Sequence, residues 1–462
     1  WLKAVPRGAL ALPRPTASAR TPLASRMSNE DGGDGPDSPG AGTLSPEAAA
    51  TRIQALHRGK STRRSVNRGE TGGGERLTGK ALAEAYQAAA AAEGRTANPL
   101  ALSALRTSGS EKFGIKAPGC DERTFNCRMR DEDLAVLCEV LQDSAPFLEE
   151  VDLTQNLLGD AGARSLATLL GRAPGLSSLT LRGNSIGAEG CEALCRAVTS
   201  CPTLRRLDLS QNPVGRGGGL AVVELLRANT SLQELFLADA ELDINVLVAL
   251  AAAMFDGAAK LKLCDIENPR LSNLQEEHTV HLGRMLRVNT HLSELRLGKH
   301  RMRDEGVRQL VSFLIENKTL RVLDLRCNEL GADGARHLGT LLSDDCQLTV
   351  LNLSGNRIGE KCNVEGARAI ADALGKNRML RHLDLNGNEL CGDALQVLGE
   401  AMEHNSTLET VALFNNQWDQ PSSFKFHQIL SDRARILPLR ADFVTSQVDL
   451  RIDICKLDGP LR

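Results

Sequence analysis

Cysteine and histidine are the residue types in this chain best suited to bind a metal or act as a nucleophile. The chain has twelve cysteines and nine histidines, and no two cysteines form the Cys-x-x-Cys pair typical of a zinc site. No nucleophile and base stand in a catalytic pattern. We therefore predict no metal site, no cofactor and no enzyme activity, and free thiols favour a cytosolic compartment. The thiols expected to be buried are Cys191, Cys195, Cys201, Cys327 and Cys391.

Residues 74–81 (GERLTGKA) have a spacing similar to that of a phosphate-binding P-loop. Ala81 stands where that motif requires a Ser or Thr to hold magnesium. The preceding residues, 67–73, are polar and glycine-rich, whereas a P-loop follows a buried strand. We therefore predict no nucleotide site.

Residues 47–64 are predicted to form a basic helix. No acidic residue lies between Glu47 and Glu70. On a helix, Ile53 and Leu56 lie on one face and could enter a hydrophobic groove of a partner. The arginines that follow them would meet an acidic surface.

The same segment, IQALHRGKSTR, resembles the IQ motif, I-Q-x-x-x-R-G-x-x-x-R, at every defined position. The IQ family binds calmodulin or related EF-hand light chains, so the resemblance implies such a partner. The implied contact residues are Ile53, Gln54, Leu56, Arg58, Gly59, Arg63 and Arg64. The alternative is a solvated basic helix that packs on the rest of the protein.

The most specific pattern is the repeat L-x-x-L-x-L-x-x-N-x-L. Its first leucines at 148, 176, 204 and 232 are 28 residues apart, and a second block runs from Leu320 to residue 418. The L-x-L centre alternates as a strand does, and the remainder, such as residues 187–198, has helical spacing. No unit can bury its apolar face alone, so the units must stack. We predict an α/β solenoid of about ten repeats, a horseshoe with an inner parallel sheet and outer helices.

The asparagine of each repeat turns the chain out of the strand, and its amide can bond to the neighbouring repeat. Ala240 and His300 replace it in two units. The predicted structural ladder is Asn156, Asn184, Asn212, Asn328, Asn356, Asn388 and Asn416.

The 28-residue period and the G-x-x-G-x-x-x-L start of each helix resemble the ribonuclease-inhibitor subfamily of leucine-rich repeats. That group includes the inhibitor itself, the activator of the Ran GTPase, the sensing ends of innate immune receptors and several axonemal proteins. The resemblance covers most of residues 129–420 and implies the horseshoe fold. It does not specify the function, because unrelated activities share this scaffold.

The inner face of the sheet is the predicted partner-binding surface. Its mixed charges suit a polar protein surface. We expect Phe236 and Phe414 to be exposed anchors, because exposed aromatic residues on a charged face are unusual. An Asp between two strand leucines is also a common filler of this repeat, so an inert role is the alternative for several of the charged residues. The predicted contact residues are Asp152, Arg182, Arg206, Asp208, Glu234, Phe236, Arg296, Asp324, Arg326, Asp384 and Phe414.

Two insertions, near residues 267–273 and 360–364, fall between a strand and a helix, so both should emerge on one rim. Insertions on one face often mark a binding face, and drift in tolerant loops is the alternative. At the ends, residues 131–142 should form an N-terminal cap, residues 424–436 a capping helix and residues 448–454 a final strand.

The predicted segments are a disordered or targeting segment (1–46), the IQ helix (47–70), a linker with short helices (71–128), the repeat domain (129–420) and a C-terminal cap and tail (421–462). Residues 1–26 are rich in Ala, Pro, Arg and Ser, so organelle targeting stays open beside a later start at Met27. The net charge of −3 disfavours a nucleic-acid partner, and no apolar run is long enough to span a membrane.

We therefore predict a protein-interaction scaffold that binds an EF-hand protein through the IQ helix and another protein through the horseshoe. The combination resembles repeat proteins of cilia and flagella, so we expect a cytoplasmic location, with the cilium or cytoskeleton as one option. The alternatives are a GTPase activator of the Ran type, although that family ends in an acidic segment and this chain does not, and a ligand sensor of the innate-receptor type.

Overall fold

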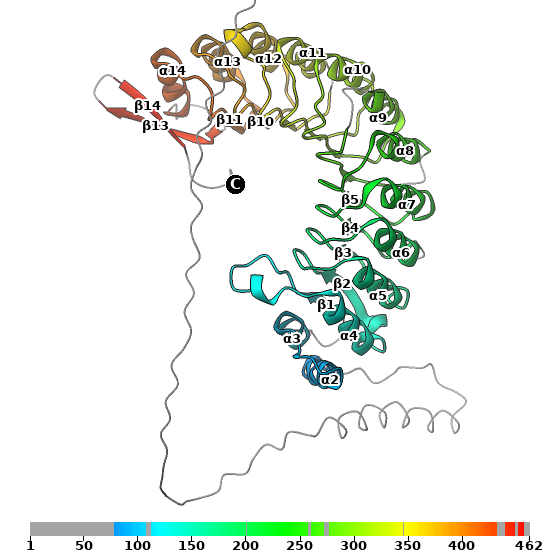
Figure 1. The fold of residues 1–462 in the computed structure, drawn as a ribbon. Helices are drawn as coiled ribbons and strands as arrows, with labels where there is room; N and C mark the ends of the chain where they lie inside the picture. Colours follow the sequence, from blue (N-terminus) through cyan, green and yellow to red (C-terminus); the bar gives the residue numbers. More distant parts are fainter. Residues whose placement is uncertain are drawn as a thin grey trace, which may run out of the picture. The chain divides into compact units, whose positions relative to one another are not determined.

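The structure is a computed structural model that describes residues 78–107, 112–199, 201–256, 260–271, 277–344, 346–431, 439–448 and 451–456. All of these residues belong to one compact unit of the chain, Pro46–Arg462. The segment 1–46 and the IQ segment lie outside the described residues. Within them the predicted solenoid is confirmed, because parallel strands follow one another in chain order in a single sheet with helices along its outer side (Figure 1).

The main sheet has twelve strands, all parallel, and each strand pairs with the strands before and after it in the sequence. The strands are β1 (Phe113–Lys116), β2 (Leu148–Asp152), β3 (Ser178–Thr180), β4 (Arg206–Asp208), β5 (Glu234–Phe236), β6 (Leu263–Asp265), β7 (Glu294–Arg296), β8 (Val322–Asp324), β9 (Val350–Asn352), β10 (His382–Asp384), β11 (Thr410–Ala412) and β12 (Arg440–Ala441).

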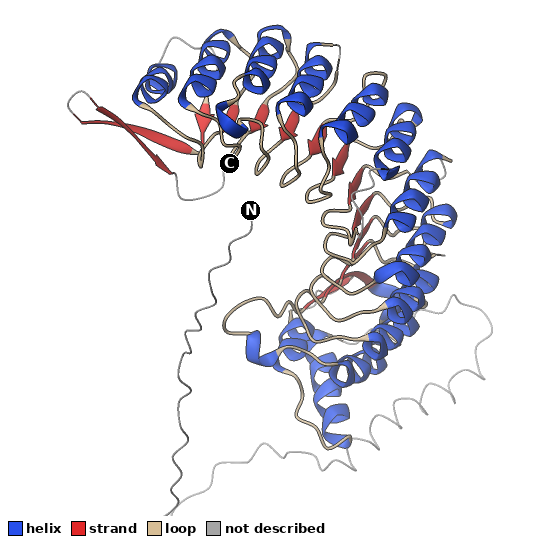
Figure 2. Cartoon of the chain, turned by 45° about the horizontal axis from the view of Figure 1, so that its top comes forward, coloured by secondary structure: helices blue, strands red, loops and turns tan. Residues whose placement is uncertain are grey.

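Most of the helices form a second layer along the outer side of the curve, as Figure 2 shows. In the part of the chain that the structure describes, no helix is long and apolar enough to cross a membrane. The helices are α2 (Gly79–Ala92), α3 (Pro99–Arg106), α4 (Asp131–Leu141), α5 (Asp160–Leu170), α6 (Ala188–Val198), α7 (Gly215–Ala228), α8 (Ile244–Phe255), α9 (Glu277–Val288), α10 (Asp304–Leu314), α11 (Ala332–Ser343), α12 (Glu365–Lys376), α13 (Gly392–His404) and α14 (Gln420–Ser431).

The leucines of the repeat form the core between the two layers. In the repeat that contains β3, Leu176, Leu179 and Leu181 are all 0% exposed. Leu179 pairs in register with Leu207 of β4, so equivalent leucines stack from one repeat to the next. The burial of these rows removes apolar surface from water along the whole array, which is the main stabilising term of such a fold.

Strands β2 to β11 each end in a turn with one left-handed residue. This residue directly precedes the ladder asparagine, and it has φ of 57° at Gln211, 53° at Cys327 and 68° at Gly355. The turn points the side chain at this position toward solvent, so Cys327 is exposed and the prediction that it is a buried thiol is wrong. Cys391 is only half-buried, whereas Cys191, Cys195 and Cys201 are buried as predicted.

The folded array begins earlier than the predicted boundary at residue 129. Strand β1 pairs in parallel with β2 and is the first strand of the sheet, so residues 71–128 are not only a linker. Helices α2 and α3 cover this end, and Tyr86 of α2 is buried there. Burial raises the pKa of Tyr86 to about 12. The sequence shows no periodic signal here, because the described part of this segment contains one short strand and no complete repeat.

The C-terminal end is closed by α14 and a hairpin. The predicted final strand is in fact two antiparallel strands, β13 (Phe443–Val448) and β14 (Arg451–Lys456). Trp418, Phe426 and Phe443 form an edge-to-face cluster with ring centroids 4.9–5.9 Å apart. This cluster covers the last leucines, as an aromatic cap does at a solenoid end.

Candidate protein-binding surface

The ladder asparagines join each repeat to the one before it. Asn212 donates from Nδ2 to the carbonyl oxygens of Leu181 at 2.9 Å and Leu209 at 3.1 Å, and its Oδ1 accepts the N–H of Ile186 at 3.0 Å. Asn184 and Asn328 bond in the same way. The same amide contacts to the preceding repeat recur at Asn356, Asn388 and Asn416, and Asn156 makes its contact to Ala117.

His300 replaces a ladder asparagine and makes the equivalent bond. Its Nε2 lies 2.8 Å from the carbonyl oxygen of Ile266 in the preceding repeat. A carbonyl only accepts, so Nε2 carries the proton and Nδ1 accepts from Nε2 of His278 at 3.1 Å. Burial lowers the pKa of His278 to about 4 and the pKa of His300 to about 3, so both rings are neutral.

A second set of asparagines, which the sequence analysis missed, holds the opposite edge, where each helix leads into the next strand. Asn317 donates to the carbonyl oxygen of Leu286 in the preceding repeat, and its Oδ1 accepts the N–H of Leu320 at 2.8 Å. In the sequence, each of these asparagines stands three residues before the first leucine of a repeat, in the pattern N-x-x-L. The members of this set are Asn229, Asn289, Asn317, Asn377 and Asn405, all buried.

At the start of α5, α6 and α11, two glycines make room for an aspartate from the preceding repeat. Asp160 accepts the N–H groups of Gly187 at 2.7 Å and Gly190 at 2.9 Å. A Cβ at Gly190 would lie 2.5 Å from the Asp160 carboxylate. Asp304 accepts from Gly331 in the same way, at 2.7 Å. The G-x-x-G spacing therefore reflects a capping contact between repeats, because a carboxylate stabilises a helix N-terminus.

These contacts fix the strands that form the inner face, and they bring some predicted residues together on β4 to β8. Arg206 bonds to Glu234 of the next strand at 2.6 Å and lies 3.9 Å from Asp208. Arg296 bonds to Glu294 at 2.5 Å. The predicted mixture of charges is therefore an array of ion pairs that run along and across the strands.

Phe236 is not the exposed anchor that the sequence analysis predicted. Its side chain is only 6% exposed. The guanidinium carbon of Arg206 lies 4.1 Å from the ring centroid, and that of Arg296 lies 5.8 Å from it. The arginines cover the ring because a guanidinium is weakly hydrated and stacks on an aromatic face.

Glu267 is a central residue of the network that the sequence analysis did not select. It pairs with Arg326 and with Lys299 at 3.2 Å, and it is 6% exposed. Burial raises the pKa of Glu267, but the hydrogen bonds and charges of Arg326 and Lys299 outweigh burial and hold the pKa below its ordinary value. Glu267 was missed because its repeat is degenerate, so its register was uncertain.

Other carboxyl groups of the inner face are more buried than the sequence analysis predicted. Asp208 and Asp324 are only 3% and 7% exposed. Burial raises the pKa of Asp324 and of Asp265, whose carboxylate lies 3.3 Å from Arg296. Burial also raises the pKa of Asp384 on β10. These groups therefore brace the turns and arginines, and only their outer atoms can reach a partner.

The remaining predicted contact residues lie outside this network. Arg182 is half-buried and has no ion pair among the described residues, and Asp152 accepts from Thr154. Phe414 is half-buried, packs against the core and lies under Lys456, whose Nζ is 5.9 Å from the ring centroid. The inner face is thus a continuous surface with a charged centre.

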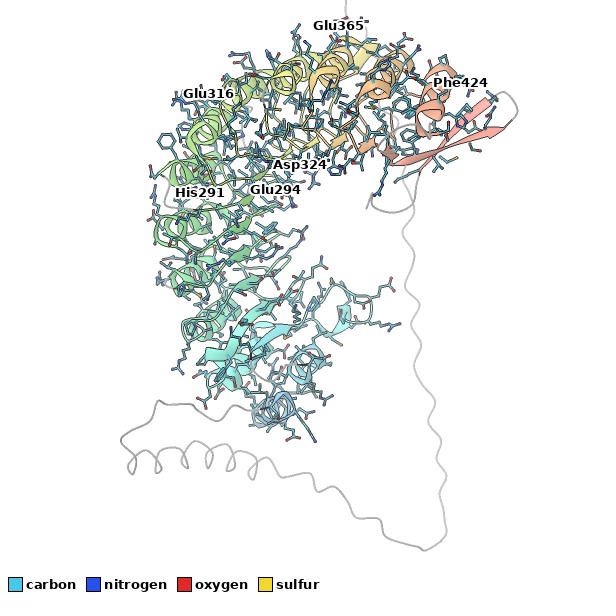
Figure 3. All side chains as sticks on the ribbon, turned by 180° about the vertical axis from the view of Figure 1, so that it is seen from behind. His291, Glu294, Glu316, Asp324, Glu365 and Phe424 are labelled. Carbon is cyan, nitrogen blue, oxygen red and sulfur yellow. The ribbon has the colours of Figure 1, made fainter. Side chains whose placement is uncertain are left out.

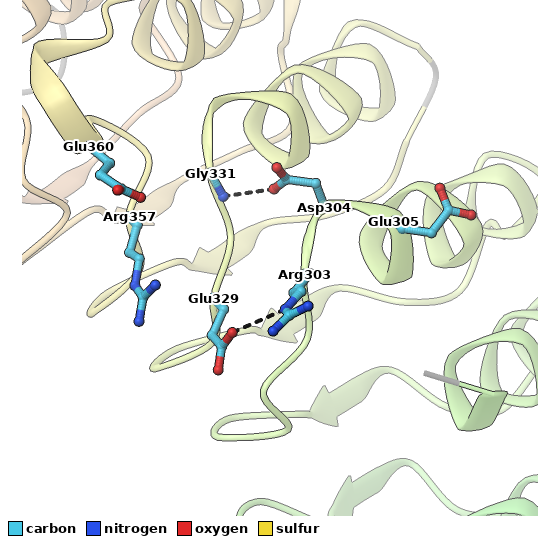
Figure 4. Close-up of a pocket in the computed structure, with 7 residues that line it drawn as sticks. All are labelled: Arg303, Asp304, Glu305, Glu329, Gly331, Arg357 and Glu360. Atoms are coloured by element: carbon cyan, nitrogen blue, oxygen red, sulfur yellow. Dashed lines mark hydrogen bonds and ion pairs between the residues drawn. The ribbon is translucent and has the colours of Figure 1, made fainter. Parts of the chain in front are cut away.

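A polar pocket lies on the rim where strands lead into helices (Figure 4). It has a volume of about 470 Å³ and includes Glu360 from the second insertion. Arg303 pairs with Glu329 at 3.2 Å, whereas Arg357 has no ion pair among the described residues. The other lining residues are Asp304, Glu305 and Gly331. Within the described ranges, no group of three or more His, Cys, Asp or Glu could hold a metal ion.

The comparisons with known proteins identify leucine-rich repeats in this chain. A family model described as "Leucine Rich repeat" matches residues 144–167, 176–195, 200–223, 288–311, 316–339, 345–371 and 376–399. The matches fall on the strand and helix units of the solenoid. The chain therefore contains leucine-rich repeats, and its fold is an α/β leucine-rich-repeat solenoid.

Two curated proteins are similar to parts of this chain. Leucine-rich repeat-containing protein 34 of Mus musculus is 32% identical over 226 residues, which cover 49% of this chain and 53% of that protein. Ribonuclease inhibitor of Sus scrofa is 28% identical over 201 residues, 42% of this chain and 36% of that protein. The chain thus spans about half or less of the length of these relatives.

Among solved structures, a leiomodin-1 structure titled as actin-binding site 2 is 20% identical and has a TM-score of 0.29. The match covers 34% of this chain and 86% of that chain.

Proposed function

We propose that this protein is an interaction scaffold whose inner sheet face binds a second protein. The observation that supports this proposal is the ion-pair network on β4 to β8, where Arg206, Arg296 and Arg326 are held in place by carboxylates and by Phe236. Arginine and aromatic residues are enriched where interfaces gain most of their energy. Because the charges are already positioned, a partner does not have to order them.

The partner that fits this face is a folded polar surface with both signs of charge. Arg206 and Glu234 expose 38% and 42% of their side chains, so each can exchange part of its ion pair for a contact with a partner. Arg182, in the turn after the neighbouring strand β3, adds a cation that has no ion pair among the described residues.

The test of the inner face is a comparison of captured proteins. The double variant Arg182→Glu/Arg206→Glu reverses two charges on the inner face, and Arg164→Glu is the matched control on outer helix α5, where the side chain is 53% exposed. We expect quantitative affinity capture to recover at least one protein with the wild type and the control that the double variant loses. Identical sets of captured proteins from all three forms would contradict the proposal.

We also propose that the segment around Ile53 binds calmodulin or a related EF-hand protein. The support is the match to the IQ pattern and the absence of acidic residues around it. The test is isothermal titration of the full chain with calmodulin, with and without calcium. Gln54→Ala/Arg58→Ala should weaken binding about tenfold or more, which corresponds to about 1.4 kcal/mol.

The matched control for this titration is Lys60→Ala/Thr62→Ala, which changes two positions that the IQ pattern leaves undefined. This control should bind as the wild type does. Absence of binding in both calcium states would refute the EF-hand proposal and leave the inner-face proposal standing.

A further inference from the structure

Helix α8 carries an apolar stripe on the outer side of the array. The helix has no charged residue from Ile244 to Phe255. Val248 and Ala249 are half-buried, Ala252 is exposed and Phe255 is 50% exposed. The outer side of a solenoid helix is ordinarily polar because it faces water. The stripe therefore indicates a surface that something covers.

The apolar surface continues onto the two helices beside α8. Figure 1 shows α7 and α9 on either side of α8 along the outer curve. Leu220 of α7 is 39% exposed, and Val280 of α9 is half-buried.

At one level beside the stripe the charged residues differ in sign on the two sides, whereas one turn further on both sides carry an exposed arginine, Arg227 on α7 and Arg287 on α9. The carbonyl oxygen of Leu225 on α7 accepts the N–H of Asn229 at 2.7 Å, and that of Met285 on α9 accepts the N–H of Asn289 at 2.9 Å. Leu225 and Met285 are thus equivalent positions, and so are the exposed residues just before them. The exposed residue just before Leu225 is Glu224 on α7, and the exposed residue just before Met285 is Arg284 on α9. A carboxylate and a guanidinium therefore lie at the same level on opposite sides of α8.

We propose that this face binds a second copy of the same chain about a two-fold axis parallel to α8. That rotation sets α8 on its copy and sets α7 opposite α9 of the other copy. Glu224 of each copy then faces Arg284 of the other, so the ion pair forms twice, as a two-fold interface requires. Leu220 meets Val280 in the same way. Arg284 has no ion pair among the described residues, and Glu224 pairs only within its own helix, with Arg227 at 2.7 Å.

The shape of the array fits this arrangement. The small side chains of Ala249 and Ala252 allow the two α8 helices to approach closely, because interaxial distance depends on the side chains at the contact. The outer helices follow a convex curve (Figure 2), so helices that flank α8 would lie further from the other copy, at a separation that long side chains such as Glu224 and Arg284 can span. The contact is apolar at its centre and charged at its border, as protein interfaces are.

The expected association is weak. Helix α8 has 12 residues and is about 18 Å long. With neighbouring helices roughly 10 Å apart, the patch covers a few hundred Å² per copy, below the total of about 1,200 Å² typical of stable complexes. We therefore expect a dimer that dissociates on dilution, with a dissociation constant in the micromolar range.

Sedimentation velocity of the full chain over about 1 to 200 μM tests the proposal, because this range brackets a micromolar dissociation constant. The wild type should shift from monomer to dimer as concentration rises. Glu224→Arg and Arg284→Glu should each raise the dissociation constant at least about tenfold, since like charges then face each other. The double variant Glu224→Arg/Arg284→Glu should restore dimerisation because the pair is rebuilt with reversed signs.

Two further variants complete the design. Ala252→Glu places a charge at the centre of the contact and should abolish the dimer. Glu365→Arg on α12 is the matched control, because Glu365 also pairs with an arginine three residues later and is exposed. It should dimerise as the wild type does. The proposal is overturned if the wild type stays monomeric at every concentration. The same conclusion holds if its α8 face is found to bind a different protein instead. A double variant that fails to restore the dimer, although circular dichroism shows it folded, overturns the two-fold arrangement.

Discussion

Replacement of one ladder asparagine should destabilise the array more than any surface substitution. In Asn212→Ala, the carbonyl oxygens of Leu181 and Leu209 and the N–H of Ile186 each lose the amide that bonds to them. Asn212 is 2% exposed, so the vacated groups are buried. A buried polar group without a partner costs about 1–3 kcal/mol, so three such groups cost about 3–5 kcal/mol after some rescue by water.

Urea unfolding followed by circular dichroism measures this loss, and hydrogen exchange locates it. Because each repeat contacts only its neighbours, amides of the repeats at β3 and β4 should lose protection first. The control is Asn126→Ala, at an exposed asparagine, which should change the unfolding free energy by less than about 0.5 kcal/mol. If Asn212→Ala were as stable as this control, the ladder would not be a stabilising device and our account of the repeats would be wrong.

The folded-state pKa values of His278 and His300 lie below the usual 6.5, so between those values the unfolded chain binds protons that the folded chain does not. Thermal stability should therefore fall as the pH drops from 6.5 toward 4. In melting curves, the double variant His278→Gln/His300→Asn should show a weaker dependence on pH. Gly190→Ala should lower the unfolding free energy by about 1–3 kcal/mol, because the added Cβ would collide with the Asp160 carboxylate. Gly375→Ala should raise the unfolding free energy by up to about 1 kcal/mol, because no atom lies within 4 Å of its added Cβ. Equal effects of the two variants in urea unfolding would contradict this reasoning. Arg326→Ala should raise the pKa of Glu267 in an NMR titration, because Lys299 would then be its one remaining ion-pair partner among the described residues. An unchanged pKa would count against the network.

The repeat pattern was sufficient to predict the fold, because its physical causes act locally. Leucines at the strand positions are buried, and the asparagine at the end of each strand bonds backward, so spacing alone placed strands, turns and helices. Strand β1 could not be predicted in this way, since its stability comes from pairing with β2 and from the helices that cover it, and not from a complete repeat.

The candidate site was predicted less well, because exposure depends on neighbours in other repeats. The pattern placed Phe236 on the inner face but could not show that Arg206 and Arg296 cover it. Glu267 lies in a degenerate unit, where the register fails. The edge asparagines, such as Asn317, were visible as N-x-x-L, but their meaning depends on a carbonyl in the preceding repeat.

The two ends of the array carry different light-absorbing residues, and unfolding from each end can therefore be followed separately. The only tyrosine, Tyr86, is buried at the N-terminal end, and Trp418 packs on two phenylalanines at the C-terminal end. The other tryptophan is Trp1, so Trp1→Phe leaves a single indole fluorophore. Phe424 on α14, labelled in Figure 3, is 51% exposed, so this end of the array lies close to solvent. Fluorescence of Trp418 would then report fraying of the last repeats, and the absorbance of Tyr86 that of the first.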